Sequence, residues 1–243
     1  MRLAIISDIH GNFIALQTVL AEIEKERVDQ IVCLGDVTFN GPQPRQAVQR
    51  LRELACPVVM GNTDEFLFNP PTPEPNNEND QRIVDVVHWA IAQLSPDDIA
   101  FVQTFQPRVE LALENGKLLC FHGSPNSNQD LILATTPDAE LARFFDRYKS
   151  AVMAGGHSHT QMLRRYLDTV LINPGSVGMP FERDASGRVQ HRSPRAEFAI
   201  LTATGSDFGV DLRRVAFDLD ALIRAARANG MPNVERWAGE WGA

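Results

Sequence analysis

The sequence predicts an α/β fold, and three observations support this prediction. Short apolar runs alternate with segments of helical periodicity in the first part of the chain, a pattern typical of parallel strands joined by right-handed crossover helices. Further strand-like apolar runs dominate the second half. Five of the predicted strands run directly into residues that can bind a metal ion, as expected where the carboxyl ends of strands meet at one sheet edge. The 243 residues suffice for one large domain and are few for two, so we expect a single domain over residues 1–243.

The first three predicted strands alternate with two helices. Leu3 to Ile6 is an apolar run, and apolar residues then recur at helical spacing from Phe13, with Asn12 as the predicted N-cap. Gln30 to Leu34 is the second strand and Pro57 to Met60 is the third. The helix between them carries on one face Ala47, Val48 and Leu51.

Residues 66–107 interrupt this alternation. Asn69 to Asp80 contains four prolines and four asparagines and shows no periodicity, so we expect a mobile loop there. A helix is predicted from about Gln81 to Gln93, and a short one follows with Ser95 as its N-cap and Pro96 at its first position. We interpret the whole segment as an insertion near the mouth of the site, able to act as a lid.

The second half predicts strands and one closing helix. Val109 to Leu113 and Lys117 to Phe121 flank the sequence Glu114-Asn115-Gly116, which indicates a hairpin. The remaining predictions are strands at Ala151 to Ala154, Val170 to Asn173, Glu197 to Thr202 and Val210 to Val215, and an amphipathic helix at Leu219 to Ala228.

The composition excludes some classes of partner. The chain has 31 acidic and 23 basic residues and a formal net charge of −8, whereas proteins that bind a nucleic-acid backbone usually carry a basic excess. The apolar run before Ser7 is too short for a signal peptide, and no stretch is long enough to span a membrane, so we expect a cytoplasmic protein with no membrane partner. Cys33, Cys56 and Cys120 show no CxxC spacing and are expected to be reduced thiols. The composition leaves open whether the chain forms a homo-oligomer.

Metal-capable side chains follow the predicted strands in order. They are Asp8 and His10 after the first strand, Asp36 after the second, Asn62 after the third, His122 after the strand ending at Phe121, and His157 and His159 after the strand ending at Ala154. In an extended segment residues i and i+2 point the same way, so we expect Asp8 to face one pocket with His10, and His157 to do so with His159. Seven mixed nitrogen and oxygen ligands exceed the need of one ion. They suit two ions of Mn, Fe, Zn, Co or Ni that share a carboxylate.

Taken together, these motifs are those of a known family. The chain resembles the calcineurin-like metallophosphoesterase superfamily, and within it the small bacterial and archaeal phosphodiesterases, in six motifs that run in the family's order: SDIHGN (7–12), GDVTFNGP (35–42), GNTD (61–64), FHGSP (121–125), GGHSHT (155–160) and NPGSVG (173–178). The resemblance covers residues 1 to about 215. It implies a four-layer α/β-β/α sandwich of two mixed β-sheets flanked by helices. It also implies a metal-dependent phosphodiesterase that hydrolyses a small phosphate ester by in-line attack of a hydroxide lying between two metal ions, with Mn²⁺ as the first candidate.

The resemblance also assigns roles to individual residues. One ion would be bound by Asp8, His10, Asp36 and His159, and the other by Asp36, Asn62, His122 and His157, so that Asp36 bridges them. The catalytic group would then consist of Asp36, Asn62, Asp64 and His122. Because no covalent intermediate is needed, Ser124 and Ser176 are expected to support loops.

One position departs from the family pattern. Many members read Gly-Asn-His-Asp/Glu at the third motif, where the histidine contacts the phosphate, whereas this chain reads Gly61-Asn62-Thr63-Asp64. Small phosphodiesterases of the family often carry cysteine there, so the missing histidine puts in doubt the turnover of monoesters and phosphoproteins. Asp64 is expected either to form a hydrogen bond with a ligand or with Thr63, or to serve as the acid at a helix N-terminus.

Four residues are candidate substrate contacts: Asn40, Thr63, His88 and Arg183. Asn40 and Arg183 lie in loops and could contact the phosphate, although a turn-shaping asparagine and a solvated arginine are the simpler interpretations. His88 lies in the predicted insertion helix, where it is either an ordinary packed residue or a lid residue that supplies the acid absent at position 63.

Two other functions stay open. A protein phosphatase or a diadenosine-polyphosphate hydrolase shares the SDIHGN motif, but the arginine-bearing motif of those relatives is absent, since residues 35–41 read GDVTFNG. A non-catalytic metal-binding scaffold is the second, because the superfamily includes a retromer subunit that works as an interaction platform. Such relatives tend to lose metal-site histidines, and this chain keeps all seven ligands.

Overall fold

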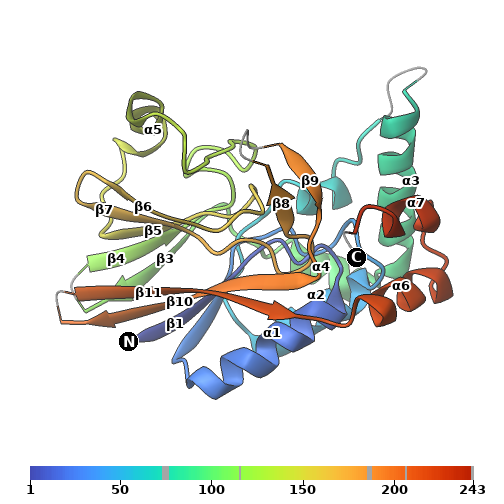
Figure 1. Cartoon of the computed structure of the whole chain (residues 1–243), viewed down its shortest axis with the longest axis horizontal. Coiled ribbons are helices and arrows are strands. Elements are labelled where there is room, and N and C mark those ends of the chain that lie inside the picture. Colours follow the sequence, from blue (N-terminus) through green and yellow to red (C-terminus); the bar gives the residue numbers. More distant parts are fainter. Residues whose placement is uncertain (73–76, 115, 185–187, 206, 242–243) are drawn as a thin grey trace.

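Two mixed β-sheets pack face to face in the computed structural model, and helices cover their outer faces (Figure 1). The structure describes residues 1–72, 77–114, 116–184, 188–205 and 207–241. This architecture confirms the predicted sandwich of two mixed sheets flanked by helices.

The first sheet has four strands, in the order β11 (Asp207–Ala216), β10 (Arg195–Thr204), β1 (Arg2–Ile6) and β2 (Gln30–Cys33). β1 runs parallel to β2 and antiparallel to β10. Both faces of β1 are buried: Leu3 and Ile5 belong to the core between the sheets, while Ala4 and Ile6 belong to the core under the helices. This explains why β1 is a continuous apolar run.

The second sheet has five strands, in the order β3 (Val109–Leu113), β4 (Gly116–Cys120), β5 (Val152–Ala154), β7 (Thr169–Asn173) and β6 (Met162–Tyr166). The three central strands are parallel, and each edge strand pairs antiparallel to its neighbour. Like β1 and β2, the parallel strands of this sheet continue from their carboxyl ends into the residues of the candidate site.

Helices complete the layers. α1 (Phe13–Glu26), α2 (Pro44–Leu54) and α6 (Leu219–Ala228) pack on the outer face of the first sheet, and α5 (Asp138–Phe145) packs on the second (Figure 1). Asn12 caps α1 as predicted, since its side chain accepts a hydrogen bond from the N–H of Ala15.

The predicted insertion forms a short 3-10 helix, η1 (Asp64–Leu67), and two α-helices, α3 (Glu78–Gln93) and α4 (Pro96–Val102). Ser95 and Asp98 form a capping box at the start of α4. α3 is packed on the body of the protein, because Val87 and Ala90 are buried against Phe39. The indole N–H of Trp89 also donates to the carbonyl of Asn229, 3.3 Å away. Residues 73–76 of the loop predicted to be mobile lie outside the described residues.

Some sequence predictions need correction. Residues Pro57 to Met60 do not form a regular strand; they make single bridges to Cys33 and to Gln106. Six elements were not predicted, namely η1, α5, β6, α7 (Val234–Ala238) and the two strands of a hairpin, β8 (Phe181–Arg183) and β9 (Val189–Arg192). These elements are short, and several alternate polar with apolar residues only weakly. The pairing of β3 with β4 is confirmed, although Asn115 of its turn lies outside the described residues.

Two smaller predictions can be compared with the structure. All three cysteines are free thiols, as expected, and Cys33 and Cys120 are buried. No helix within the described residues is both long and apolar enough to cross a membrane.

Candidate metal centre

The carboxyl ends of the strands bring all seven predicted ligands together. The loop after β1 and the loop after β2 lie side by side, because the N–H of Asp8 donates to the carbonyl of Gly35 at 2.9 Å and the N–H of His10 donates to that of Asp36 at 2.8 Å. The loop that carries Asn62 also approaches Asp36 closely, and glycine allows this: a Cβ at position 61 would lie 2.1 Å from Oδ1 of Asp36.

The ligand atoms fall into two groups that share one residue. In each group the candidate atoms lie within 4.8 Å of one another. We call the first group the His10 site (Asp8, His10, Asp36 and His159) and the second the His122 site (Asp36, His122, His157 and Asn62). Asn62 joins the second group because its Oδ1 lies 2.9 Å from Nε2 of His122. Asp36 belongs to both, as a bridging carboxylate would.

The backbone at these ligands corrects one step of the sequence argument. Asp8 and His10 are not extended: their φ angles are 54° and 49°, in the left-handed region. Asp36, His157 and His159 have similar values of 54°, 66° and 52°. The paired side chains therefore reach one pocket through tight left-handed turns, not through the alternation of a strand. Each such residue costs about 1 kcal/mol or more, and this kind of strain is typical of functional sites.

Three histidines are oriented by backbone carbonyls. Nδ1 of His10 donates to the carbonyl of Phe39 at 2.9 Å, and Nδ1 of His122 donates to that of Leu34 at 2.7 Å. Nδ1 of His159 donates in the same way to Met179, 2.7 Å away. Each bond directs the Nδ1 proton towards the carbonyl, so that Nε2 is the nitrogen directed into the centre and available to a metal ion, as metal-binding histidines require.

The donor atoms fit a cation. Nε2 of His10 lies 3.0 Å from Nε2 of His159, so that two lone pairs face each other in a buried position. Oδ1 of Asp8 is buried without a hydrogen-bond partner among the described residues and lies 3.2 Å from Nε2 of His159. A buried acceptor with no donor is costly, and a metal ion would satisfy all three atoms at once. Imidazole, carboxylate and amide donors together suit Mn, Fe, Co, Ni or Zn.

The charges of the two sites differ. Burial and the neighbouring His159 lower the pKa of His10 to about 4, so its imidazole is neutral near pH 7. Burial opposes protonation of His122, but the adjacent Asp36 outweighs it and raises the pKa of His122 to about 10. Burial also works against the charge of Asp36, yet His122 holds the pKa of this carboxyl below its ordinary value. A metal ion binding at the His122 site would therefore displace a proton.

A family comparison agrees with this geometry. A family model of the calcineurin-like phosphoesterase superfamily domain matches residues 1–203. The chain belongs to this superfamily.

Solved structures and a curated relative extend the match along the chain. A metallophosphoesterase from Sphaerobacter thermophilus is 26% identical, with a TM-score of 0.77 and coverage of 98% of both chains. The hypothetical protein PH1004 from Pyrococcus horikoshii OT3 has a TM-score of 0.80 at 19% identity over 97% of this chain and 96% of its own, which shows a shared fold. The protein MJ0912 of Methanocaldococcus jannaschii is 27% identical over 98% of this chain and 96% of its own length.

In this superfamily member Asp64 is fully buried next to the candidate ligands, and its carboxylate is occupied by the neighbouring loops. Its Oδ1 accepts from the N–H of Val37 at 2.9 Å and from the N–H and hydroxyl of Thr38 at 3.2 and 3.0 Å, and its Oδ2 accepts from the N–H of Gly61 at 3.3 Å. Burial and the charge of Asp36 raise the pKa of Asp64 to about 6. Asp64 is also the first residue of η1. Asp64 is thus the acid at a helix N-terminus, whereas its hydrogen bonds come from Val37, Thr38 and Gly61 and not from a ligand or from Thr63, and its carboxylate joins the loops that carry Asp36 and Asn62.

The candidate substrate contacts are placed unequally. Thr63 is buried beside the centre, where its N–H donates to Oδ1 of Asp36 at 2.9 Å. Asn40 has a φ angle of 78° and lies in the loop after Asp36. Arg183 braces the loop of His157 and His159, since its guanidinium donates to the hydroxyl of Thr160 at 2.9 Å and to the carbonyl of Ser158 at 3.1 Å. His88 is exposed on α3, and its imidazole forms no hydrogen bond with another described residue, so its role as a lid acid stays a prediction.

The structure also adds residues that the sequence analysis missed. Phe181 stacks on the imidazole of His159, with ring centroids 4.6 Å apart and planes 15° apart. Ser176 supports the site as expected, because its hydroxyl donates to the carbonyl of Asp8 at 2.7 Å. The segment SVGMPFERD (176–184) follows a predicted site motif, but nothing in its sequence distinguishes Phe181 from a core aromatic residue.

Proposed function

We propose that this superfamily member is a phosphodiesterase that uses two divalent transition-metal ions, with Mn²⁺ as the first candidate, to hydrolyse a small phosphate ester. The observation that carries the proposal is the pair of ligand groups that share Asp36. Two ions bound there would supply an activated water and neutralise charge on the phosphoryl oxygens.

The chain's own residues favour this chemistry in three ways. The histidine lone pairs are fixed before a ligand arrives, which lowers the cost of assembling the site. The N–H of Thr63 fixes the shared carboxylate of Asp36. A metal-activated water makes a nucleophilic side chain unnecessary. Ser124 is accordingly engaged in its own loop, where its hydroxyl donates to Asp130 at 2.5 Å and accepts from the N–H of Asn126 at 3.0 Å.

A cavity next to the His122 site supports a diester over a monoester. Its volume is about 470 Å³, and it is lined by Met60, Glu65, Phe105, Arg108 and Ser124, among others. Met60 lies two residues before Asn62 and Ser124 two residues after His122. The start of β3 lies beside them, since Val109 pairs with Cys120. A diester has a second organic arm, and this cavity offers a place for it.

The decisive experiment measures metal content and activity together. The purified protein should contain about two transition-metal ions per chain and hydrolyse bis(p-nitrophenyl) phosphate. Chelation should abolish this activity, and Mn²⁺ should restore it more fully than Mg²⁺. Full activity in the metal-stripped protein would sink the proposal. Two ions per chain without hydrolysis of any phosphodiester, nucleotide or phosphopeptide would instead support the scaffold alternative.

A further inference from the structure

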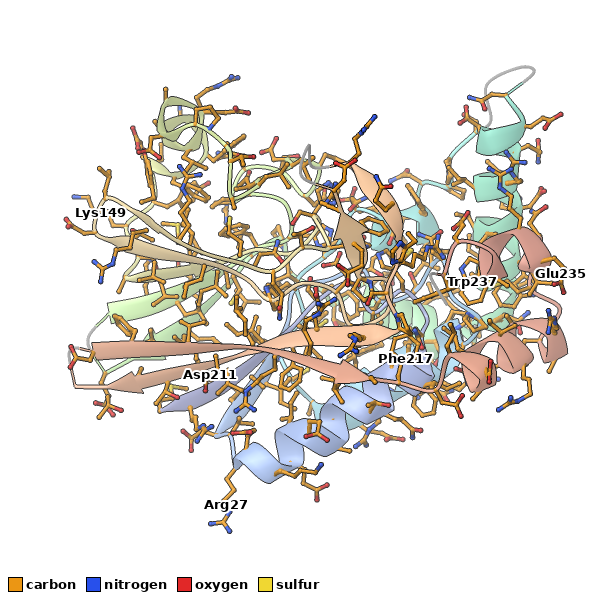
Figure 2. All side chains as sticks on the ribbon, viewed as in Figure 1. Arg27, Lys149, Asp211, Phe217, Glu235 and Trp237 are labelled. Carbon is orange, nitrogen blue, oxygen red and sulfur yellow. The ribbon has the colours of Figure 1, made fainter. Side chains whose placement is uncertain are left out.

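The C-terminal helix reaches the His10 site through one loop. Trp237 of α7 is buried, and its indole N–H donates to the carbonyl of Asn40 at 2.9 Å. The preceding carbonyl, that of Phe39, is the acceptor that orients His10. Figure 2 shows Trp237 on the side of α7 that faces the body of the protein, with Glu235 on the outer side. The position of His10 therefore depends on a loop whose neighbouring carbonyl is fixed by Trp237.

The residues just after α7 reach the His10 site by a second route, through the β8–β9 hairpin. The N–H of Arg192 in β9 donates to the carbonyl of Glu240 at 2.8 Å, and its guanidinium pairs with the Glu240 carboxylate at 2.5 Å. This guanidinium lies over the rings of Trp237 and Trp241, at 5.9 and 5.8 Å. Across the hairpin Arg192 pairs with Phe181, the residue that stacks on His159.

Both routes end at histidines of one site. His10 and His159 are the two imidazoles of the His10 site, with Nε2 atoms 3.0 Å apart. His122 is oriented differently, by the carbonyl of Leu34 at the end of the first sheet. α7 also lies outside residues 1–203, the part of the chain that the family model matches.

We propose that the C-terminal clamp, made of Trp237 and Glu240, sets the affinity of the His10 site for its metal ion by positioning His10 and His159. Partners that orient metal ligands commonly change metal affinity by 10- to 100-fold. The proposal requires that the centre binds metal, but it does not depend on which ester is hydrolysed. Its test is therefore a binding measurement that can fail while phosphodiesterase activity stands.

Trp237 of the clamp and Trp241 beside it make a matched pair of variants. Trp237→Phe keeps an aromatic ring and removes the N–H that donates to Asn40. Trp241→Phe makes the same chemical change where the indole N–H is buried without a hydrogen-bond partner among the described residues. Calorimetric titration of the metal-free full chain with Mn²⁺ should show one of two binding events weakened about tenfold in Trp237→Phe. Both events should be unchanged in Trp241→Phe, and thermal melting should show similar stability losses in the two variants.

Single-site backgrounds identify the affected site. His157→Ala removes a ligand of the His122 site, and there Trp237→Phe should still weaken Mn²⁺ binding about tenfold. His159→Ala removes a ligand of the His10 site, and there the Trp237→Phe effect should disappear. The proposal is overturned if Trp237→Phe binds both ions like the wild type, if Trp241→Phe weakens binding equally, or if the effect follows the His122 site.

Discussion

The two halves of the metal centre differ in how closely the protein encloses them. Every ligand of the His10 site is buried, with exposed fractions of 0% for Asp8, 2% for His10 and 4% for His159. In the His122 site His122 is buried, but Asn62 and His157 are only half-buried. Met60 and Ser124, each two residues away in sequence from Asn62 and His122, line a cavity. The protein thus has a closed metal site and an open one.

This difference indicates the side from which a substrate would approach. On the closed side, carbonyls and an aromatic ring hold two histidines with their Nε2 atoms facing each other, so this side could hold an ion away from solvent. On the open side, a half-buried imidazole and an amide leave room for a ligand from outside. We therefore expect a substrate to approach from the His122 side, and the predictions below test this contrast.

The largest effect should come from Asp36, the residue that both sites share. Asp36→Asn removes the charge common to the two ligand groups. The metal content should fall from about two ions to less than one, and kcat/KM for bis(p-nitrophenyl) phosphate should fall at least about a thousandfold. Metal analysis and steady-state kinetics measure both quantities. Asp211→Asn, an exposed change on β11, is the control and should alter neither. Two independent sites would be indicated if Asp36→Asn kept one ion at full occupancy and most of the activity.

Thr63 tests what the open side lacks. A monoester dianion brings more negative charge than a diester, so a group that can be cationic and donate a proton matters more for it. Threonine offers neither property, and its hydroxyl is buried without a hydrogen-bond partner among the described residues. Thr63→His should raise the monoester-to-diester ratio of kcat/KM about a hundredfold, the typical effect of one donor to a charged transition state.

The control for this change is Thr63→Val, which has nearly the same shape and should leave the ratio unchanged. Metal content must be equal in all three proteins, because the N–H of residue 63 contacts Asp36. An unchanged ratio in fully metallated Thr63→His would show that discrimination arises elsewhere, with Arg183 and His88 as the next candidates.

Glu197 of β10 tests the residues that support the closed site. Its backbone N–H donates to the carbonyl of Ser176, whose hydroxyl supports Asp8. Burial raises the pKa of Glu197 to about 7, although Arg214 lies 3.1 Å away and opposes the shift. The folded protein therefore binds this proton more tightly than the unfolded chain does, and stability should fall as pH rises from about 4.5 towards 7.

Glu197→Gln should remove this loss. Relative to the wild type, its free energy of unfolding should gain about 2 kcal/mol between pH 5 and pH 8, as measured by urea unfolding of the metal-free protein. Glu182→Gln is the matched control, since Glu182 also pairs with Arg214, which instead lowers its pKa. That variant should show no gain at pH 8. A parallel pH profile for Glu197→Gln and the wild type would mean that Glu197 stays ionised through this range.

The sequence predicted the centre better than its surroundings, for a physical reason. Six of the seven ligands follow a strand that a continuous apolar run makes visible, and parallel strands bring their carboxyl ends to one edge whatever the loops do. The seventh, Asn62, follows a segment that makes only single bridges. The left-handed turns at Asp8 and His10 were missed, because aspartate and histidine give no signal as clear as glycine does. The carbonyls of Phe39 and Met179 were missed as well, since any residue offers a carbonyl.

The insertion shows the opposite case. Its helix boundaries were close to those observed, and Ser95 caps α4 as expected. The amphipathic pattern of α3 shows that one face is buried but does not show against what. In the structure that face packs on Phe39, in the loop that orients His10. A lid on the substrate and a support for the closed metal site have the same periodicity, and only the tertiary contacts distinguish them.

The smallest expected effect is a difference in the rate of metal loss, and it tests the contrast most directly. His157→Ala leaves the His10 site complete, and His159→Ala leaves the His122 site complete, so each variant lacks one imidazole and retains one site. A chelator must reach an ion through accessible donors, and Asn62 and His157 are half-buried whereas Asp8 and His10 are fully buried. With Co²⁺ as the probe, EDTA should therefore strip His159→Ala about tenfold faster than His157→Ala, because leaving the closed site requires loops bonded to Phe39 and Met179 to open. Equal rates would show that burial in this structure does not limit exchange. Faster loss from His157→Ala would reverse the assignment of the open side, and with it the expected direction of substrate approach.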